Sequence, residues 1–169
     1  MQKLKIALSG AHGTGKSFKV FEFAKDYKLK YPSSKVGIIQ ENIIDCPLPI
    51  NKGTTVESQY WIISNQITKE IEYQEKYDIV ISDRTVFDPL PYMKSVGLIT
   101  DSNRFLDFLK PFGQSYDVIY LMDYKTNNYV FSDGLRDIDL EFRNKVGEYF
   151  DDIFSDLEAS NCIKNLIRI

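Results

Sequence analysis

Hydrophobic and polar positions divide this chain into alternating strand and helix patterns. Short apolar runs predict strands at Lys5–Ser9, Val36–Gln40, Tyr77–Arg84, Tyr116–Met122 and Ile163–Ile169. Runs that are apolar at nearly every position are typical of strands covered on both sides in a parallel sheet. Because helical patterns separate these runs, the sequence predicts an α/β fold, in which a five-stranded parallel sheet carries helices on both faces.

Apolar residues three and four positions apart predict the helices. The first, Phe18–Leu29, ends before Pro32 and has a buried face made of Val20, Ala24, Tyr27 and Tyr31. The second carries a stripe of Val56, Tyr60, Ile63, Ile67 and Ile71, with Gln66 off the stripe. Residues 86–97 predict a short or bent helix, and residues 104–109 predict another that ends before Pro111. The last helix buries Phe142, Val146, Phe150, Ile153 and Leu157.

Two segments lack a periodic pattern. Residues 45–55 carry Pro47, Pro49 and Gly53, and we expect them to border a substrate pocket rather than to link two domains. Residues 124–138 are polar and carry Gly134 and Arg136, a composition that suits a lid. The sequence therefore predicts a single domain over residues 1–169, with a lid at about 124–138.

Composition and charge narrow the class of protein. The chain has 169 residues, 43% of them hydrophobic and 27% charged, which fits one ordinary folded domain. Its net charge of −3 gives no overall basic field for nucleic acid, and no apolar run reaches membrane-spanning length. The two cysteines, Cys46 and Cys162, have no metal-ligand spacing and are too few for a disulfide framework. We therefore expect a reduced, cytoplasmic protein with no membrane partner, either monomeric or a homodimer.

A glycine-rich loop joins the first strand to the first helix. Residues 10–17 fit the phosphate-loop pattern G-x-x-x-x-G-K-[ST] at every fixed position. Backbone N–H groups of such a loop surround a phosphate chain at the positive end of the helix dipole. Lys16 can reach the β- and γ-phosphates, and the Ser17 hydroxyl can ligate Mg²⁺. The sequence thus predicts a site for ATP and Mg²⁺ made of Gly10, Ala11, His12, Gly13, Thr14, Gly15, Lys16, Ser17 and Phe18.

Charged residues also follow the second and third strands. Glu41 comes after the strand at 36–40, and Asp83 and Arg84 end the strand at 77–84. Because ligands bind beyond the carboxyl ends of parallel strands, we expect these residues beside the phosphate loop. Asp83 is then a candidate Mg²⁺ ligand, Arg84 a stabiliser of the transferring phosphoryl group, and Glu41 a general base. The alternatives are a helix N-cap for Asp83, a surface ion pair for Arg84 and a solvated charge for Glu41.

Further candidates lie in the lid and in the helices. Arg136 is a candidate catalytic residue, because a closing lid would bring its charge over the phosphates and exclude water. Arg143 is a weaker candidate that also fits a surface position on the last helix. His12 occupies a variable position of the loop, so we expect no catalytic role for it. The candidate acceptor contacts are Glu41, Gln66, Arg84, Asp88 and Tyr92.

Together these residues resemble the P-loop kinases of the nucleoside and nucleotide kinase group, in particular the small AAA-type kinase family that includes the ribosylnicotinamide kinase domain. The resemblance spans nearly the whole chain and rests on the phosphate loop, Glu41, the stretch from Gln66 to Tyr92, and residues 133–137 and 141–143. It implies a single-domain P-loop NTPase fold, Mg·ATP, an acid near the acceptor hydroxyl and a lid arginine. Nucleoside kinases often carry Glu-Arg-Ser at residues 83–85, where this chain has Asp-Arg-Thr, so Glu41 and Asp83 both stay candidates for the base.

Three functions are compatible with the sequence. The leading hypothesis is a kinase that transfers the γ-phosphoryl group of ATP to a hydroxyl of a small acceptor, such as a nucleoside or a nucleotide. The second is a kinase acting on a polynucleotide or a modified base, which the acidic net charge disfavours. The third is a regulatory P-loop NTPase switch with a protein partner, which the acids and the arginine at the strand ends disfavour.

Overall fold

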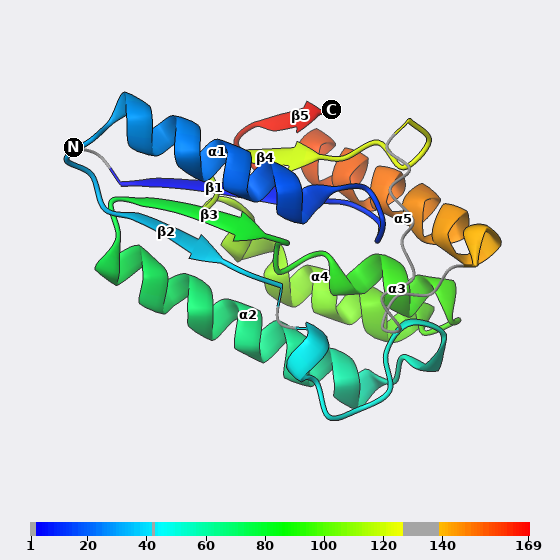
Figure 1. The fold of residues 1–169 in the computed structure, drawn as a ribbon. Helices are drawn as coiled ribbons and strands as arrows, with labels where there is room; N and C mark the ends of the chain where they lie inside the picture. The colour runs from blue at the N-terminus through cyan, green and yellow to red at the C-terminus, as the bar shows by residue number, and fades with distance from the viewer. Residues whose placement is uncertain (1–2, 42, 127–138) are drawn as a thin grey trace.

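A computed structural model describes residues 3–41, 43–126 and 139–169 of the chain (Figure 1). The strands are β1 (Leu4–Ser9), β2 (Val36–Ile39), β3 (Ile79–Asp83), β4 (Val118–Leu121) and β5 (Leu166–Arg168). The helices are α1 (Lys16–Lys30), α2 (Val56–Lys76), α3 (Pro89–Ser95), α4 (Ile99–Gly113) and α5 (Leu140–Ala159), with two 3₁₀ turns, η1 (Ile43–Asp45) and η2 (Asn51–Gly53). All neighbouring strands pair in parallel, in the order β2-β3-β1-β4-β5, which confirms the predicted five-stranded parallel sheet.

Each face of the sheet has its own hydrophobic core, because successive side chains of a strand point to opposite faces. On one face α1 packs Val20 and Ala24 against Leu8 and Ile81. On the other face Ala7 belongs to a larger core with side chains from α2, α3, α4 and α5. Figure 1 shows α1 on one side of the sheet and α2, α3 and α4 on the opposite side. Helices therefore cover both faces, as predicted.

The sheet register brings three strand ends to the same edge. Leu8 of β1 pairs with Asp83 of β3, and Ile39 of β2 lies opposite Ser82 of β3. The phosphate loop follows β1 directly, and Glu41 follows β2 after one intervening residue. Residues far apart in the sequence are therefore neighbours at the carboxyl edge of the sheet, where ligands bind in this class of fold.

Several elements differ from the prediction, and β5 covers only Leu166–Arg168 of the strand expected at residues 163–169. α4 is longer at both ends than the predicted helix at 104–109, and Pro111 lies inside its last turn. Burial of Phe105 and Leu109 stabilises the longer helix and offsets the backbone hydrogen bond that a proline removes. β2 is an edge strand in which Val36 and Ile38 remain partly exposed, so it is less covered than we expected.

The buried face of α2 matches the predicted stripe only in part. In the predicted stripe, Tyr60 is 57% exposed and Ile71 is 55% exposed, so that part of the prediction is wrong. Ile63 is buried as predicted, and Val56 and Ile67 pack partly buried against the core. The buried face also carries the polar residues Gln59, Gln66 and Glu70. Polar side chains that find hydrogen-bond partners inside the protein can be buried, and in the sequence they are indistinguishable from surface positions.

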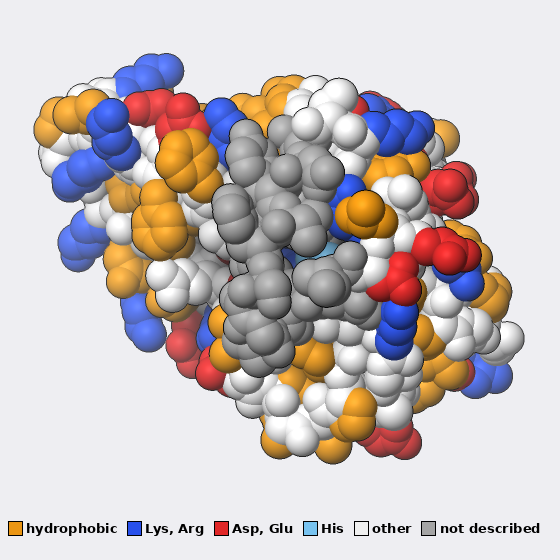
Figure 2. Space-filling model, turned by 45° about the vertical axis from the view of Figure 1, so that its right-hand side comes forward, with side chains coloured by type: hydrophobic (Ala, Val, Ile, Leu, Met, Phe, Trp, Pro, Cys, Tyr) orange, Lys and Arg blue, Asp and Glu red, His pale blue; other side chains and the backbone are white. Residues whose placement is uncertain are grey.

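The surface gives two further observations. In Figure 2 acidic and basic side chains are intermixed with hydrophobic ones on the face that is drawn, outside the grey residues. Among the described residues, no helix has the length and apolar character needed to cross a membrane. Most of the predicted lid, including Arg136, lies outside the described residues, which contain only Tyr124–Thr126 of that segment.

Candidate active site

The phosphate loop folds tightly between β1 and α1. Gly10 and Gly15 have φ angles of 137° and 81°, a backbone conformation that favours glycine. A Cβ atom at Gly10 would lie 3.0 Å from the carbonyl oxygen of Met122, so the loop also needs a small residue here. Gly15 immediately precedes the first turn of α1, and the N–H groups of that turn point towards the carboxyl edge of the sheet.

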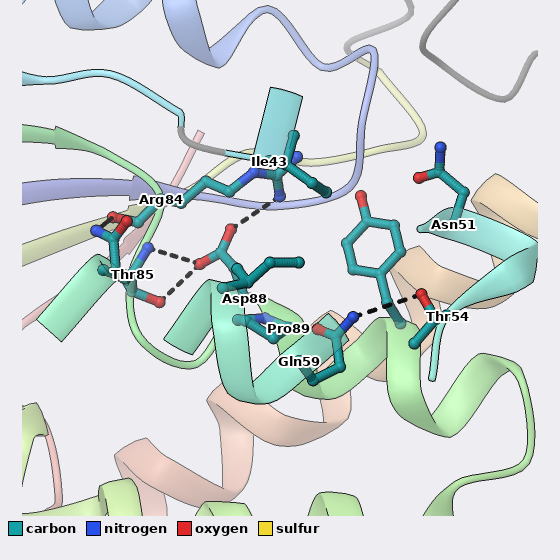
Figure 3. A pocket seen from close by; sticks show the side chains of 11 residues that line it. Ile43, Asn51, Thr54, Gln59, Arg84, Thr85, Asp88 and Pro89 are labelled. Atoms are coloured by element: carbon teal, nitrogen blue, oxygen red, sulfur yellow. Dashed lines mark hydrogen bonds and ion pairs between the residues drawn. The ribbon is translucent and has the colours of Figure 1, made fainter. Parts of the chain in front are cut away.

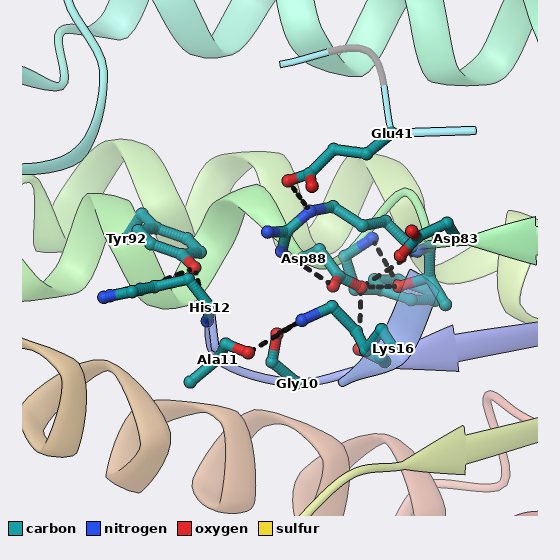
Figure 4. A network of polar contacts seen from close by, with 12 residues as sticks. Gly10, Ala11, His12, Lys16, Glu41, Asp83, Asp88 and Tyr92 are labelled. Carbon is teal, nitrogen blue, oxygen red and sulfur yellow. Dashed lines mark hydrogen bonds and ion pairs between the residues drawn. The ribbon is translucent and has the colours of Figure 1, made fainter. Parts of the chain in front are cut away.

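The Lys16 ammonium group lies inside the loop (Figure 4). Its Nζ donates hydrogen bonds to the carbonyl oxygens of Gly10 (2.9 Å) and Ala11 (2.7 Å). Burial, together with the positive charge of Arg84, lowers the pKa of Lys16 to about 8. A buried cation at the start of a helix, bonded to oxygens of the loop, is well placed to exchange these contacts for phosphate oxygens.

Ser17 and Asp83 form the candidate metal site. The Ser17 hydroxyl donates to Asp83 Oδ2 at 2.5 Å, and the other carboxylate oxygen, Oδ1, is buried and accepts no hydrogen bond among the described residues. Burial raises the pKa of the Asp83 carboxyl, and the Lys16 ammonium opposes this rise. A hydroxyl beside a carboxylate with one unsatisfied buried oxygen fits Mg²⁺, which prefers oxygen ligands. Asp83 does not cap a helix, because α3 begins only at Pro89.

Arg84 connects the two other acids of the site. Its Nε donates to Glu41 Oε1 at 2.5 Å, and its Nη1 lies 3.3 Å from Asp88 Oδ2. Burial disfavours the charge of Arg84, but the two carboxylates raise the pKa of the guanidinium well above its ordinary value. The pair is not at the surface, since the side chain of Arg84 is 9% exposed and that of Glu41 is 14% exposed. The structure therefore brings Glu41 and Arg84 together beside the phosphate loop, as predicted.

Two residues hold the phosphate loop from outside. The His12 N–H donates to the Tyr92 hydroxyl oxygen at 3.1 Å, and Arg143 Nε donates to the His12 carbonyl oxygen at 3.0 Å. Tyr92 also lies near Arg84, whose Cζ is 5.7 Å from the centre of the tyrosine ring. Arg143 is buried, so the surface position that the sequence left open for it is excluded. Tyr92 and Arg143 therefore fix the backbone of the loop on which the phosphates would lie.

A cavity opens beside Arg84 and Tyr92 (Figure 3). It encloses about 20 Å³, enough for roughly one water molecule. Two of the side chains around it are charged, Arg84 and Asp88, and these two form an ion pair. The lining residues are Ile43, Asn51, Thr54, Gln59, Ile62, Gln66, Arg84, Thr85, Asp88, Pro89 and Tyr92. Asn51 and Thr54 of the irregular segment at residues 45–55 line the cavity, so this segment borders a pocket as expected, and the binding of a substrate there stays a prediction.

The remaining candidates have distinct positions. Gln66, Asp88 and Tyr92 all line the cavity, but Asp88 Oδ1 already accepts hydrogen bonds from Ser9 Oγ (2.7 Å) and from the N–H and hydroxyl of Thr85 (2.9 and 2.6 Å). Asp88 therefore also fixes the turn after β3. Phe18 is 74% exposed at the start of α1, and its contact with nucleotide stays a prediction.

The sequence analysis missed a buried polar cluster behind the site. Lys5 Nζ lies 2.6 Å from Glu70 Oε2, and Glu70 Oε1 accepts hydrogen bonds from the Tyr116 hydroxyl (2.7 Å) and from Gln66 Nε2 (2.8 Å). The one signal for it was Lys5, a charged residue inside an otherwise apolar strand.

The parallel sheet, the phosphate loop after its central strand and the acid at the end of the adjacent strand define a P-loop nucleotide-binding protein. Residues 5–164 match the family profile described as AAA domain, and the chain belongs to that family. No curated protein sequence is significantly similar to the chain.

Solved structures show that the fold is that of the P-loop nucleoside and nucleotide kinases. The chain is similar to thymidylate kinase from Ehrlichia chaffeensis, with a TM-score of 0.69 and 18% identity over 100% of this chain and 93% of the other. Deoxyadenosine kinase from M. mycoides with bound dATP has a TM-score of 0.65 and 19% identity over 98% and 90% of the two chains. The NadR protein in complex with NR has a TM-score of 0.73 and 14% identity, covering 98% of this chain and 45% of its own.

Proposed function

We propose that this protein is a kinase that transfers the γ-phosphoryl group of ATP to a hydroxyl of a small acceptor, a nucleoside, a nucleotide or a related compound. The observation that carries the proposal is the meeting of the phosphate loop, Asp83, Arg84 and Glu41 at one sheet edge, beside a separate cavity for a second substrate. A phosphate loop alone suits any NTPase, whereas an acid and an arginine next to a second cavity suit transfer to an acceptor. Thymidylate and deoxyadenosine kinases among the similar structures support this class of acceptor.

Each residue of the site then has a role in the transfer. The loop N–H groups and Lys16 bind the β- and γ-phosphates, and Ser17 and Asp83 hold Mg²⁺, which neutralises phosphate charge when bound. Glu41 accepts the proton of the acceptor hydroxyl. The acceptor oxygen bonds to the γ-phosphorus while the bond from that phosphorus to the bridging oxygen breaks, and ADP leaves. Arg84 stabilises the negative charge of the transferring group, and Arg136 of the predicted lid contributes further positive charge.

The cavity favours an acceptor without a phosphate. Its two charged side chains, Arg84 and Asp88, already pair with each other, and the amides of Asn51 and Gln59 are neutral hydrogen-bonding groups. Among the described residues, the hydrogen bonds of Gln59 Nε2 are long, 3.5 Å to Thr54 Oγ1 and 3.3 Å to Ser58 Oγ, so the amide can exchange them for a hydrogen bond to a polar ring edge of the acceptor. A nucleoside is larger than the cavity, so its entry requires residues 43–54 to move outward.

An acceptor screen tests the proposal. ADP release from Mg·ATP is followed with nucleosides, nucleoside monophosphates, ribosylnicotinamide and single-stranded DNA, and Lys16→Ala serves as the inactive control. We expect one small acceptor to stimulate ADP release strongly in the wild-type protein and not in Lys16→Ala. Stimulation by DNA alone, lost steeply with added salt, would identify a polynucleotide kinase instead. Slow ATP turnover that no acceptor stimulates would refute the kinase and point to a nucleotide switch.

We expect ATP to bind more weakly as the pH rises. The pKa of Lys16 is about 8 in the protein without nucleotide, and bound phosphates favour the protonated amine. Above pH 8 the protein must therefore take up a proton to bind ATP, so the dissociation constant rises about tenfold between pH 7 and pH 9. Calorimetric titration in two buffers of different ionisation enthalpy measures both affinity and proton uptake. Lys16→Ala should lose this pH dependence, and an unchanged wild-type affinity would contradict the lowered pKa.

A further inference from the structure

Arg84 has an unusual backbone conformation. Its φ angle is 98°, in a region that residues with side chains rarely adopt because it strains the backbone. Its N–H still donates to the Leu8 carbonyl oxygen at 2.9 Å, a hydrogen bond that continues the pairing of β3 with β1, and the positive φ changes the direction of the chain at this point. This turn sends the guanidinium towards Glu41 and Asp88 rather than along the strand. Such a conformation persists only where the surrounding structure holds it.

Buried side chains hold the backbone on both sides of this turn. The Arg84 carbonyl oxygen accepts hydrogen bonds from Ser82 Oγ at 2.7 Å and from Gln66 Nε2 at 3.3 Å. Two residues further on, the Val86 N–H donates to the Tyr116 hydroxyl oxygen at 3.0 Å. Ser82, Gln66 and Tyr116 are each at most 2% exposed, so water does not compete for these contacts.

Glu70 joins these contacts into one cluster. Its Oε1 accepts hydrogen bonds from both Gln66 and Tyr116, and its Oε2 pairs with Lys5. Lys5 Nζ also lies 4.1 Å from the centre of the Tyr116 ring. Burying such an ion pair costs desolvation free energy, and apolar residues of similar volume often give an equal or higher stability. A general gain in stability therefore does not account for the cluster. Its hydrogen bonds to the backbone of residues 84 and 86 indicate instead that it fixes the conformation of this turn.

We infer that Glu70, Gln66, Ser82 and Tyr116 are positioning residues, which hold the backbone of residues 84–86 so that the Arg84 guanidinium stays aimed at the reacting groups. The consequence for turnover rests on the proposed kinase function, but the consequence for Arg84 itself does not. Misplacement of a catalytic group by about 1 Å can reduce a rate by as much as a hundredfold. Loosening the turn should therefore reduce kcat and leave the affinity for ATP almost unchanged, because the phosphate loop is not part of the cluster.

Two buried serines provide a matched comparison. Ser82 and Ser102 are both fully buried, and each hydroxyl donates to one backbone carbonyl, that of Arg84 for Ser82 and that of Leu90 for Ser102 (3.2 Å). Ser82 Oγ also accepts a hydrogen bond from Gln66 Nε2 at 3.0 Å. Ser82→Ala and Ser102→Ala thus remove the same buried hydroxyl, but only Ser82→Ala removes contacts within the cluster. A double variant, Ser82→Ala with Tyr116→Phe, releases both sides of the turn. Circular dichroism and thermal unfolding establish that each variant folds.

We expect kcat to fall about tenfold in Ser82→Ala and further in the double variant, with the KM for ATP within about twofold of wild type and Ser102→Ala unaffected. A second measurement needs no turnover: solvent exchange of the Arg84 Nε–H, seen by NMR and assigned by its loss in Arg84→Lys. We expect faster exchange in Ser82→Ala and in the double variant only. If exchange accelerates but no acceptor stimulates the wild-type protein, the positioning role holds and the proposed function fails. Unchanged exchange and kcat in a folded double variant would overturn the inference.

Discussion

Replacing Glu41 with Gln is expected to reduce kcat by about 10²–10⁴-fold, the usual contribution of a general base. The amide keeps the shape of the side chain and an oxygen that Arg84 Nε can still bond, but it cannot accept the proton of the acceptor hydroxyl. Glu41 lies after β2 and is not part of the phosphate loop, so the affinity for ATP should change little. Steady-state kinetics with the stimulating acceptor, together with calorimetric ATP binding, separates the two effects.

Asp45→Asn is the matched control for this substitution. Asp45 lies four residues further on, in η1, and its side chain is exposed. The same carboxylate-to-amide change there should leave kcat within about twofold, as is usual for surface substitutions. If Glu41→Gln retains kcat within about threefold of wild type, Glu41 is not the base. Asp83 then becomes the candidate, and its ligation of Mg²⁺ has to be tested separately by the Mg²⁺ concentration that Asp83→Asn requires.

The local parts of the site could be predicted from the sequence. The phosphate loop needs only eight consecutive residues between a strand and a helix, so its geometry follows from a short stretch of chain. Glu41, Asp83 and Arg84 could be placed beside it because parallel strands present their carboxyl ends at one edge. The structure confirms this proximity, with Ser17 bonded to Asp83 and Arg84 bonded to Glu41.

The contacts that hold the site could not be predicted, because they depend on how side chains of distant elements meet. Lys5 and Glu70 are far apart in the sequence, and nothing in either local pattern indicates that they form a buried pair. The same limit explains the error on α2, where apolar spacing favoured Tyr60 while the helix buries Gln59 and Gln66. Amphipathic patterns locate apolar faces well, but they do not identify polar groups that are buried with their partners.

Replacing Arg84 with Lys is expected to reduce kcat by about 10²–10³-fold, although the charge is retained. The guanidinium donates from Nε to Glu41 and lies with Nη1 beside Asp88, and its planar fork has further N–H groups for the transferring phosphoryl group. An ammonium is a compact point charge on a flexible side chain. It therefore cannot bond both carboxylates and the phosphoryl oxygens at the same time. The loss should fall on kcat, because the transferring group gains its extra charge in the transition state.

Arg104→Lys is the control for this change, since the Arg104 side chain is 77% exposed and its ion pair with Asp101 is long, at 3.6 Å. It should show wild-type kinetics. Arg84→Lys should also unfold at a lower temperature, because a weaker partner for two largely buried carboxylates destabilises the fold. If Arg84→Lys lowers only the unfolding temperature and retains kcat, Arg84 serves the fold and not the transfer. A kcat that falls at a temperature where the variant is fully folded assigns Arg84 to the chemical step.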